Sequence, residues 1–426
     1  MHQGKNDPPV RLFGEITLPG DKSISHRAVM LGALANGRTT VKGVLDCDDC
    51  NYTIRAFKDM GVAIEKKDGV TTIEGKGLKG LRKPAQPINV GQSGTSMRII
   101  AGILAGQDFD STITGHDQLL SRPMKRVVEP LSLMGADIKA RDGEYPPLVI
   151  KGGAVHGIDY DMAIPSAQIK SAILFAGLYS KDAVRVKEKF RSRDHTERMM
   201  KYFGADIKVR GKYVTLKGLR ELEPKDLEIP GDISSASFFI AAAIILKGSR
   251  IRINRVGINP TRAGIIEILK EMGASLKILR RENKFEPVGD ILVEYGQTNG
   301  IIIEEDRIPG IIDELPVIFV LAALSRGRTV IKGAGELRVK ETDRIASMKE
   351  NLERMGASIS LAGDAIIIDG VPELKGADLK SYADHRTCMS AAVAALAAKG
   401  PSRIDDVECV GKSFPGFFKM LDGLKR

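Results

Sequence analysis

Lys22, Ser23 and Arg27 lie within two helical turns of one another and combine two cations with a hydroxyl. This combination suits the binding of a single anion, although a solvated basic helix start would have the same composition. The segment 93–96, Ser-Gly-Thr-Ser, contains a glycine that lets the backbone approach a ligand closely, as phosphate-binding loops do. Both segments therefore favour a ligand that carries phosphate or carboxylate groups.

Arg344 and Arg386 add two guanidinium groups, whose planar donors match the paired oxygens of carboxylates and phosphates. Asp313 and Glu341 are carboxylates that could exchange protons with a ligand, or could serve only as helix caps. His385, beside Arg386, could equally be a base or an ordinary capping residue. Together these residue types predict acid–base chemistry on a small anionic molecule.

These residues stand where helices are expected to begin. A first set of six helix starts places Ser, Thr, Gly or Asp at the N-cap, in segments 20–28, 91–98, 164–172, 230–238, 311–319 and 382–390. A helix N-terminus offers N–H groups and about half a positive charge, so it attracts anions. A second set begins mostly with basic residues, near 122–123, 193–195, 260–262, 340–344 and 412–413. A cation there costs about 0.3 kcal/mol or more, so we expect an anion to offset it.

Two glycine patterns predict an internal repeat. In the first, an apolar helical run ends at Gly37, Gly106, Gly248, Gly327 and Gly400, with Ser180 at the equivalent point of a sixth copy. In the second, a Met or Phe precedes the glycine of a helix end at Gly61, Gly135, Gly204, Gly273 and Gly356, with a degraded copy in MLDGLKR. We expect these glycines to end helices with a positive φ. Six units of about 70 residues, each helix–strand–helix–strand, predict an α/β protein built by repetition, in a few globular lobes.

Composition limits the class of protein. The 426 residues suggest two to three domains at about 150 residues each. The net charge of +10 favours an anionic partner, but only 5% of residues are aromatic and none is Trp, which disfavours a single-stranded nucleic-acid reader. The cations of interest are also scattered along the chain instead of forming a basic arm. A basic nucleic-acid-binding protein remains the alternative from a different class.

The cysteines and the N-terminus favour a cytoplasmic protein. Four cysteines do not form a disulfide framework, so we expect reduced thiols. The acidic neighbours of Cys47 and Cys50 are expected to raise the pKa of both thiols. The segment MHQGKNDPPV has no apolar region typical of a signal peptide, and the apolar stretches are too short to span a membrane.

Nine segments resemble the EPSP synthase family, the 3-phosphoshikimate 1-carboxyvinyltransferases of the shikimate pathway, which leads to chorismate and the aromatic amino acids. They are LPGDKSISHRAVMLGALANG, GTSMR, SRPM, PSAQIKSA, RDHTE, PGDISSA, DELP, LRVKETDR and DHR. Their spelling is similar to the second sequence class of this family. The resemblance implies an α/β (α+β repeat) fold, a two-lobed inside-out α/β barrel of six β-α-β-α-β-β units, three per lobe. It places residues 1–19 and 231–426 in one lobe, 20–230 in the other, and the active site in the cleft between them.

The activity implied by this resemblance is transfer of the enolpyruvyl group of phosphoenolpyruvate to the 5-hydroxyl of shikimate 3-phosphate. Phosphate leaves through a tetrahedral intermediate. Two phosphates and two carboxylates must then gather at one place, so cations and helix ends must offset their repulsion. The resemblance implies no metal and no cofactor. The expected partners are the two small substrates, with no nucleic acid, no membrane and a monomeric chain.

The resemblance also implies roles for particular residues. Shikimate 3-phosphate would be bound by Lys22, Ser23, Arg27, Ser166, Ala167, Gln168, Arg193, Asp313 and Lys340. Phosphoenolpyruvate would be bound by Lys22, Gly94, Arg122, Gln168, Arg344, Arg386 and Lys412. The catalytic groups would be Lys22, Asp313 and Glu341. Asp313 would act as base toward the 5-hydroxyl and Glu341, assisted by Lys22, as proton donor to the methylene. A coupled Lys340–Glu341 pair stays open as the alternative for each proton transfer.

Three positions bear on the phosphoenolpyruvate pocket and on the runner-up function. Gln92 stands where the family usually has Asn, and its longer side chain could reshape the phosphoenolpyruvate pocket. Gly94 is retained, which predicts sensitivity to glyphosate, an inhibitor of this family that takes the place of phosphoenolpyruvate. The sister enzyme that acts on UDP-N-acetylglucosamine is the runner-up. It often carries a reactive Cys five residues before an Arg-Pro pair, where this chain has Asp117. A non-catalytic homologue is disfavoured because no nominated residue is missing.

Overall fold

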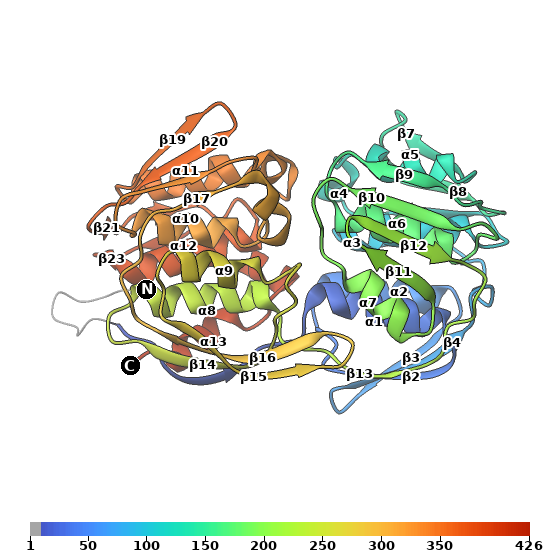
Figure 1. Cartoon of the computed structure of the whole chain (residues 1–426), viewed down its shortest axis with the longest axis horizontal. Coiled ribbons are helices and arrows are strands. Elements are labelled where there is room, and N and C mark those ends of the chain that lie inside the picture. Colours follow the sequence, from blue (N-terminus) through green and yellow to red (C-terminus); the bar gives the residue numbers. More distant parts are fainter. Residues whose placement is uncertain (1–9) are drawn as a thin grey trace. The chain divides into compact units, whose positions relative to one another are not determined.

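The computed structural model describes residues 10–426, which form two compact units. Unit 1 contains the chain up to Pro19 and from Pro230 to Arg426, and unit 2 contains Gly20–Ile229 (Figure 1). The chain therefore leaves unit 1 after its first strand and returns to it once unit 2 is complete. The N-terminal segment in which we expect no signal peptide lies outside the described residues, except for Val10.

Unit 2 contains three four-stranded sheets of one topology. In each sheet one edge strand is parallel to its neighbour, and the next strand in spatial order is antiparallel to the strands on both of its sides. The strands, sheet by sheet, are β13 (Asp226–Glu228), β2 (Asn36–Lys42), β4 (Val70–Lys76), β3 (Ala63–Lys67); β5 (Ile88–Asn89), β6 (Ser111–Thr114), β8 (Tyr145–Lys151), β7 (Asp137–Arg141); and β9 (Asp159–Met162), β10 (Val184–Glu188), β12 (Tyr213–Lys217), β11 (Asp206–Arg210). Alternate residues of these strands, such as Val214 and Leu216, are buried, as expected of sheets with one covered face.

Unit 1 repeats this topology twice and then simplifies it. Its third repeat forms two two-stranded sheets. The strands are β1 (Phe13–Thr17), β14 (Arg250–Gly257), β16 (Pro287–Glu294), β15 (Leu276–Asn283); β17 (Ile302–Ile303), β18 (Arg328–Ile331), β20 (Ala365–Asp369), β19 (Ser358–Ala362); β21 (Leu374–Lys375) with β23 (Ala398–Lys399); and β22 (Asp378–Leu379) with β24 (Arg403–Ile404).

Each repeat contributes two main helices. The first helices are almost wholly buried: α1 (Lys22–Leu34), α3 (Gly94–Ala105), α6 (Ala167–Gly177), α8 (Ile233–Ile245), α10 (Leu315–Ala323) and α12 (His385–Ala397). The second helices are α2 (Asp48–Asp59), α5 (Lys125–Leu133), α7 (His195–Tyr202), α9 (Gly264–Glu271), α11 (Arg344–Arg354) and α13 (Phe417–Leu424). Short pieces are α4 (Asp117–Leu120), η1 (Glu305–Gly310), η2 (Gly335–Val339) and η3 (Glu408–Lys412).

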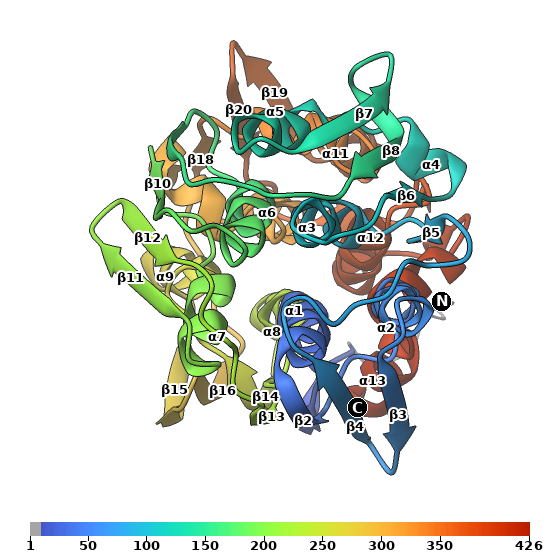
Figure 2. The same ribbon diagram turned by 90° about the vertical axis from the view of Figure 1, so that its right-hand side faces the viewer.

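The helices lie inside each unit and the sheets lie outside. In unit 1, α8, α10 and α12 contact one another, and in unit 2, α3 contacts both α1 and α6. Figure 2, which looks onto unit 2, shows these three helices at the centre and the strands around them. No sheet formed by residues 10–426 closes on itself. The predicted fold, six repeated α/β units in an inside-out arrangement, is therefore confirmed.

The glycines of the second pattern end helices as predicted. Gly61, Gly135, Gly204, Gly273 and Gly356 all have φ between +85° and +90°, directly after the last residue of a second helix. Residues that carry a side chain rarely adopt this left-handed backbone conformation, which explains why glycine occupies these positions.

The other glycine predictions hold less well. Gly106 ends α3 with φ −92° and Gly423 lies inside α13, so the prediction is wrong at both positions. Gly37 has the predicted positive φ, +126°, but it is the second residue of β2 and does not end α1.

Five of the six predicted first-helix starts are capped by a side chain, that of Asp21, Ser93, Ser166, Asp232 or Asp384. The start of α10 differs. Its N-cap residue is Glu314, which makes no capping hydrogen bond because its side chain is engaged elsewhere. The last second helix also differs, since Lys412 is the last residue of η3, Ser413 follows it, and α13 begins only at Phe417.

All four cysteines are free and buried. Burial raises the pKa of the Cys50 thiol, as expected. The pKa of Cys47 is lowered instead, because Cys50 donates a hydrogen bond to it and Lys22 lies nearby, so the expectation for Cys47 is wrong. None of the helices found in residues 10–426 is both long enough and apolar enough to cross a bilayer.

Candidate active site

Several of the predicted anion-binding residues of unit 2 lie at the N-terminal ends of its buried helices α1, α3 and α6. Lys22 is the first residue of α1, and its Nζ lies 2.9 Å from Oδ2 of Asp49, in the first turn of α2. Ser23 follows it, and the Ser23 carbonyl accepts a hydrogen bond from Nη1 of Arg27 at 2.9 Å. The start of α1 is thus held by a carboxylate of α2 and by its own second turn.

Arg27 joins three helices of unit 2. It is buried, its Nε donates to Oγ1 of Thr196 on α7, and its Nη2 donates to Oγ of Ser171 on α6. These two hydroxyls also share a hydrogen bond of 2.6 Å. The predicted shikimate 3-phosphate residues of α1 are therefore fixed against the helix that begins with Ala167.

Gln168 connects α6 to α3. Its Nε2 donates to Oγ1 of Thr95 at 3.0 Å, and its Oε1 accepts from Nη1 of Arg98 at 2.8 Å. Gly94 opens α3, and a Cβ atom there would lie 3.1 Å from Nη1 of Arg122. The structure thus brings Gln168, Gly94 and Arg122, three of the predicted phosphoenolpyruvate residues, around the first turn of α3.

A buried ion cluster anchors the segment that carries Arg193. Nζ of Lys170, on α6, lies 2.9 Å from Oε2 of Glu188 and 2.7 Å from Oε1 of Glu197. Glu188 also accepts hydrogen bonds from the backbone and side chain of Ser192. Burial raises the pKa of Glu197, although Lys170 opposes it. The cluster fixes residues 189–194 against the helix whose N-cap is Ser166.

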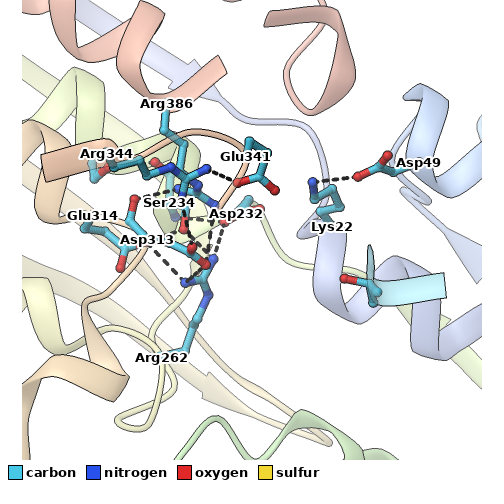
Figure 3. Close-up of polar contacts among 12 residues, drawn as sticks. Lys22, Asp49, Asp232, Ser234, Arg262, Asp313, Glu314, Glu341, Arg344 and Arg386 are labelled. Atoms are coloured by element: carbon cyan, nitrogen blue, oxygen red, sulfur yellow. Dashed lines mark hydrogen bonds and ion pairs between the residues drawn. The ribbon is translucent and has the colours of Figure 1, made fainter. Parts of the chain in front are cut away.

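In unit 1, Arg344 is the centre of the predicted site. It is the first residue of α11 and is only 1% exposed. Its Nε lies 2.8 Å from Oδ2 of Asp384, its Nη2 2.5 Å from Oε2 of Glu341, and its Nη1 3.6 Å from Oδ1 of Asp313 (Figure 3). Burial disfavours the charged guanidinium, but Asp384, Glu341 and Asp313 outweigh this and raise the pKa of Arg344.

Asp313 lies among three guanidinium groups. Besides Arg344, Nη2 of Arg386 lies 3.5 Å from Oδ2, and Nη1 of Arg386 donates to the backbone oxygen of Asp313 at 2.9 Å. Nη1 of Arg262 donates to Oδ2 at 3.4 Å. Figure 3 shows the Asp313 carboxylate directed toward these groups. The structure therefore brings together Asp313, Glu341, Arg344 and Arg386, which stand up to 73 residues apart in the chain.

Two further predicted residues adjoin this cluster through the backbone. Lys340 ends η2 and directly precedes Glu341. Nζ of Lys412 donates to the carbonyl of Ala383 at 3.0 Å, and Ala383 precedes Asp384, the N-cap residue of α12.

The expected anions are present at the basic starts of two second helices, and the protein supplies them itself: Asp384 and Asp313 pair with Arg344, and Asp313 pairs with Arg262. At the start of the first helix α1, Asp49 pairs with Lys22. The N-cap side chains of α1 and α12 also accept first-turn N–H groups. An anionic ligand must therefore compete with some of these groups for the same cations.

Several of the groups that hold the site were missed by the sequence analysis. They are Asp49, Arg98, Lys170, Arg262, Glu314 and Asp384. Arg98, Lys170, Glu314 and Asp384 stand inside recognised motifs, GTSMR, PSAQIKSA, DELP and DHR, and could have been nominated from them. Asp49 and Arg262 pair with partners 27, 51 and 52 residues away, and no local pattern indicates such pairs.

No group of three or more His, Cys, Asp or Glu side chains in the described part of the chain is arranged to hold a metal ion. The charged centre of each unit is built from Lys and Arg facing Asp and Glu.

A sequence model of the EPSP synthase family, 3-phosphoshikimate 1-carboxyvinyltransferase, matches residues 6–421. The chain belongs to the EPSP synthase family. A 3-phosphoshikimate 1-carboxyvinyltransferase of Geobacter metallireducens is 50% identical over 417 residues, 97% of each chain, and one of Geotalea daltonii is 48% identical over 426 residues, 100% of this chain and 99% of the other. The structure of an EPSP synthase from Acinetobacter baumannii is similar, with a TM-score of 0.88 and 44% identity over 98% of this chain and 96% of that one.

Proposed function

We propose that this chain transfers the enolpyruvyl group of phosphoenolpyruvate to the 5-hydroxyl of shikimate 3-phosphate and releases phosphate. The observation that carries the proposal is the cluster of Asp313 and Glu341 with Arg344 and Arg386. Two carboxylates that can move protons lie beside two guanidinium groups that can hold an anion. Addition followed by elimination requires both kinds of group.

The proposal assigns the substrates to the two sets of residues. Shikimate 3-phosphate is held by Lys22, Ser23, Arg27, Ser166, Ala167, Gln168, Arg193, Asp313 and Lys340. Phosphoenolpyruvate is held by Lys22, Gly94, Arg122, Gln168, Arg344, Arg386 and Lys412. A single reaction uses both sets of residues.

In the addition step the 5-oxygen bonds to C2 of phosphoenolpyruvate and its proton passes to Asp313. Glu341 gives a proton to C3, so that the methylene becomes a methyl group and a tetrahedral intermediate forms. In the elimination step the bond from C2 to the phosphate oxygen breaks and the departing phosphate takes the proton held by Asp313. The methyl group returns a proton to Glu341, and the carbon–carbon double bond is restored. Lys22 stabilises the negative charge of the phosphate groups.

The ion pairs of Arg344 and Arg386 support this division of roles. An anion that binds Arg344 and Arg386 replaces Glu341 and Asp313 as their partner. Glu341 then loses a cation at 2.5 Å, which favours its protonated form and suits a proton donor. Asp313 retains Arg262, which favours its ionised form and suits a base.

We further propose that the enzyme works as a monomer in the cytoplasm, without nucleic acid or membrane. All the groups assigned to the two substrates come from one chain, so the proposed site needs no second copy. Light scattering of the purified protein at working concentration tests this part: a stable dimer would contradict it.

The deciding experiment is phosphate release by the purified protein with both substrates. We expect release that requires phosphoenolpyruvate and shikimate 3-phosphate together. UDP-N-acetylglucosamine in place of shikimate 3-phosphate serves as the control for the sister activity and should give no release. A folded protein that releases no phosphate with its proposed substrates would refute the proposal.

A further inference from the structure

Arg262 is a buried cation of unit 1 with no role in the assignments above. It is 3% exposed and stands just before α9. Its Nη1 lies 3.4 Å from Oδ2 of Asp313 and 3.2 Å from Oε1 of Glu314. Its Nη2 donates to Oγ of Ser234 at the start of α8 and lies 3.6 Å from Oδ1 of Asp232. One guanidinium group thus joins the starts of α8, α9 and α10 (Figure 3).

The backbone that carries Arg262 is itself fixed. Its N–H donates to the carbonyl of Asn259 at 2.8 Å, and Nδ2 of Asn259 donates to the buried carboxylate of Glu286 at 2.9 Å. A Cβ atom at Gly264 would lie 2.8 Å from the side chain of Ile311, two residues before Asp313. The loop of Arg262 and the segment that carries Asp313 are therefore in close contact over both backbone and side chains.

Arg262 differs from the two other guanidinium groups around Asp313 in the partners that it can bind. In the proposed reaction Arg344 and Arg386 take the anionic substrate as a partner. Arg262 instead faces only protein groups in the contacts described above, at 3% exposure. Removing a buried charge from its partners is strongly unfavourable, so Arg262 stays with Asp313 when substrate binds.

We propose that Arg262 is a positioning residue for the reaction, which holds the Asp313 carboxylate in place while substrate occupies Arg344 and Arg386. This inference rests on the proposed function. Arg262 separates the roles of the two carboxylates: Glu341 is released from its cation on substrate binding, and Asp313 is not. The contact of Arg262 with Asp313 then matters for the rate of the chemical step and little for the affinity of either substrate.

Glu314 provides a matched control within the same buried group. It is fully buried, and its Oε1 accepts from Ser234 and Arg262. Its Oε2 is buried and has no hydrogen-bond partner among the described residues. Glu314→Gln keeps the accepting oxygen and removes the charge, so it perturbs the packing of the same three helix starts without removing Arg262.

The test is the rate of phosphate release by Arg262→Met, Arg262→Lys, Glu314→Gln, Asp313→Asn and the double variants of Arg262 with Asp313→Asn. We expect Arg262→Met to lower kcat about 30-fold or more, with both KM values within about threefold of wild type. Arg262→Lys, which keeps the charge but loses the fork of donors, should recover part of this loss. Glu314→Gln should retain kcat within about threefold, whatever it does to the urea midpoint.

The double variants distinguish positioning from a general structural role. If Arg262 acts through Asp313, changing it in the Asp313→Asn background should lower kcat by no more than about twofold further. Independent, multiplied losses would overturn the inference, and so would an unchanged kcat for folded Arg262→Lys. If Arg262→Met does not fold, Arg262→Lys and its double variant carry the same comparison. A wild type without activity would refute the proposed function itself, whereas an active wild type with an unaffected Arg262→Lys would refute this inference alone.

Discussion

Gly94, in the proposed phosphoenolpyruvate pocket, lies close to two guanidinium groups that an added side chain would meet. A Cβ atom there would lie 2.8 Å from Nη1 of Arg98 and 3.1 Å from Nη1 of Arg122. Both contacts are to ends of flexible side chains, so the helix would tolerate the methyl group and the guanidinium groups would move. The change should therefore act on the ligand and leave the fold intact.

We predict that the wild type is inhibited by glyphosate and that Gly94→Ala raises the inhibition constant by about tenfold or more, equivalent to ~1.4 kcal/mol. The KM for phosphoenolpyruvate should rise as well, because Arg122 is displaced. Gly335→Ala, at a position with open space around the added Cβ, is the control and should change neither constant. Inhibition constants that do not rise in Gly94→Ala would contradict the assignment.

The cations of the site differ in how much each contributes to the free energy of unfolding. Lys22 is one-fifth exposed beside Asp49, whereas Arg344 is 1% exposed and paired with the fully buried Asp384. We predict that Lys22→Ala loses phosphate release by about 100-fold or more but costs less than about 1 kcal/mol of unfolding free energy. Arg344→Ala should lose activity and also about 3–5 kcal/mol, because it leaves a buried charge unpaired.

Urea unfolding and phosphate release, measured on the same preparations, check this contrast. Glu341→Ala and Arg386→Ala should behave like Lys22→Ala and lose most activity while retaining stability. If instead Lys22→Ala were as unstable as Arg344→Ala, the start of α1 would have a structural role and the assignment of Lys22 to the substrates would be lost.

At the scale of elements, a chain of buried polar groups joins α1, α2 and α3. Nδ1 of His26 and Oγ1 of Thr53 are 2.7 Å apart, and Thr53 continues the chain to Ser96 and to the N-cap Ser93. Burial lowers the pKa of His26 to about 3; Asp49 opposes this, and Lys22 and Arg27 add to it. The folded protein therefore contains neutral His26 at all physiological pH values.

We predict that this histidine weakens the fold in acid. Its pKa is about 6.5 in the unfolded chain and about 3 in the folded protein, so below pH 6.5 the unfolded state binds a proton that the folded state does not. Stability should fall toward pH 3 by up to about 1.4 kcal/mol per pH unit from this group. His26→Asn, which keeps a group at the position of Nδ1, should flatten this slope in urea titrations. The exposed His116→Asn is the control, and an unchanged slope in His26→Asn would contradict the prediction.

Gly102 and Gly356 are glycines for two different reasons, close contact between helices and a left-handed backbone conformation. A Cβ atom at Gly102 would lie 2.2 Å from the carbonyl oxygen of Ala172, where α3 and α6 touch. Gly356 has φ +89° and open space around it. We predict a loss of about 1–2 kcal/mol for Gly356→Ala from backbone strain and of about 3 kcal/mol or more for Gly102→Ala, which forces two buried helices apart. Equal losses in urea unfolding would show that α3 and α6 can separate freely.

Local signals in the sequence account for the elements better than for the contacts between them. The five glycines after Met or Phe, and caps such as Asp21 and Ser93, identify helix ends because the residue itself satisfies a local backbone requirement. The cap of α10 could not be predicted, since the Glu314 side chain is drawn to Arg262, 52 residues away. The motifs nominated Asp313 and Arg344 but not Asp384 or Arg262, because ion pairing over 40 or 51 residues has no sequence period.

At the scale of the whole molecule, each unit completes its first sheet with a strand from a distant part of the chain. β1 pairs in parallel with β14, and β13 pairs in parallel with β2. The chain passes between units through Gly20 and Gly231, and a Cβ atom at Gly20 would lie 2.0 Å from the carbonyl oxygen of Gly43. Unit 2 therefore contains all its strands in one continuous stretch, whereas unit 1 needs the strand that precedes unit 2.

This asymmetry predicts which part of the chain folds alone. A fragment of residues 20–229 holds three complete four-stranded sheets and should unfold cooperatively in urea with native-like circular dichroism. Shortening it to 20–225 removes β13, exposes the edge of β2 and takes Leu227 and Ile229 out of the core, at a cost of about 3 kcal/mol or more.

A fragment of residues 230–426 should fold only when β1 is restored, for example by fusing residues 10–19 to its N-terminus, because β14 otherwise has an open edge. If residues 230–426 fold equally well with and without β1, the pairing of β1 with β14 contributes little to the stability of unit 1. Strand pairing would then not explain why the chain passes twice between the units. None of these fragments should release phosphate, since each lacks one of the two sets of charged residues that the proposed reaction needs.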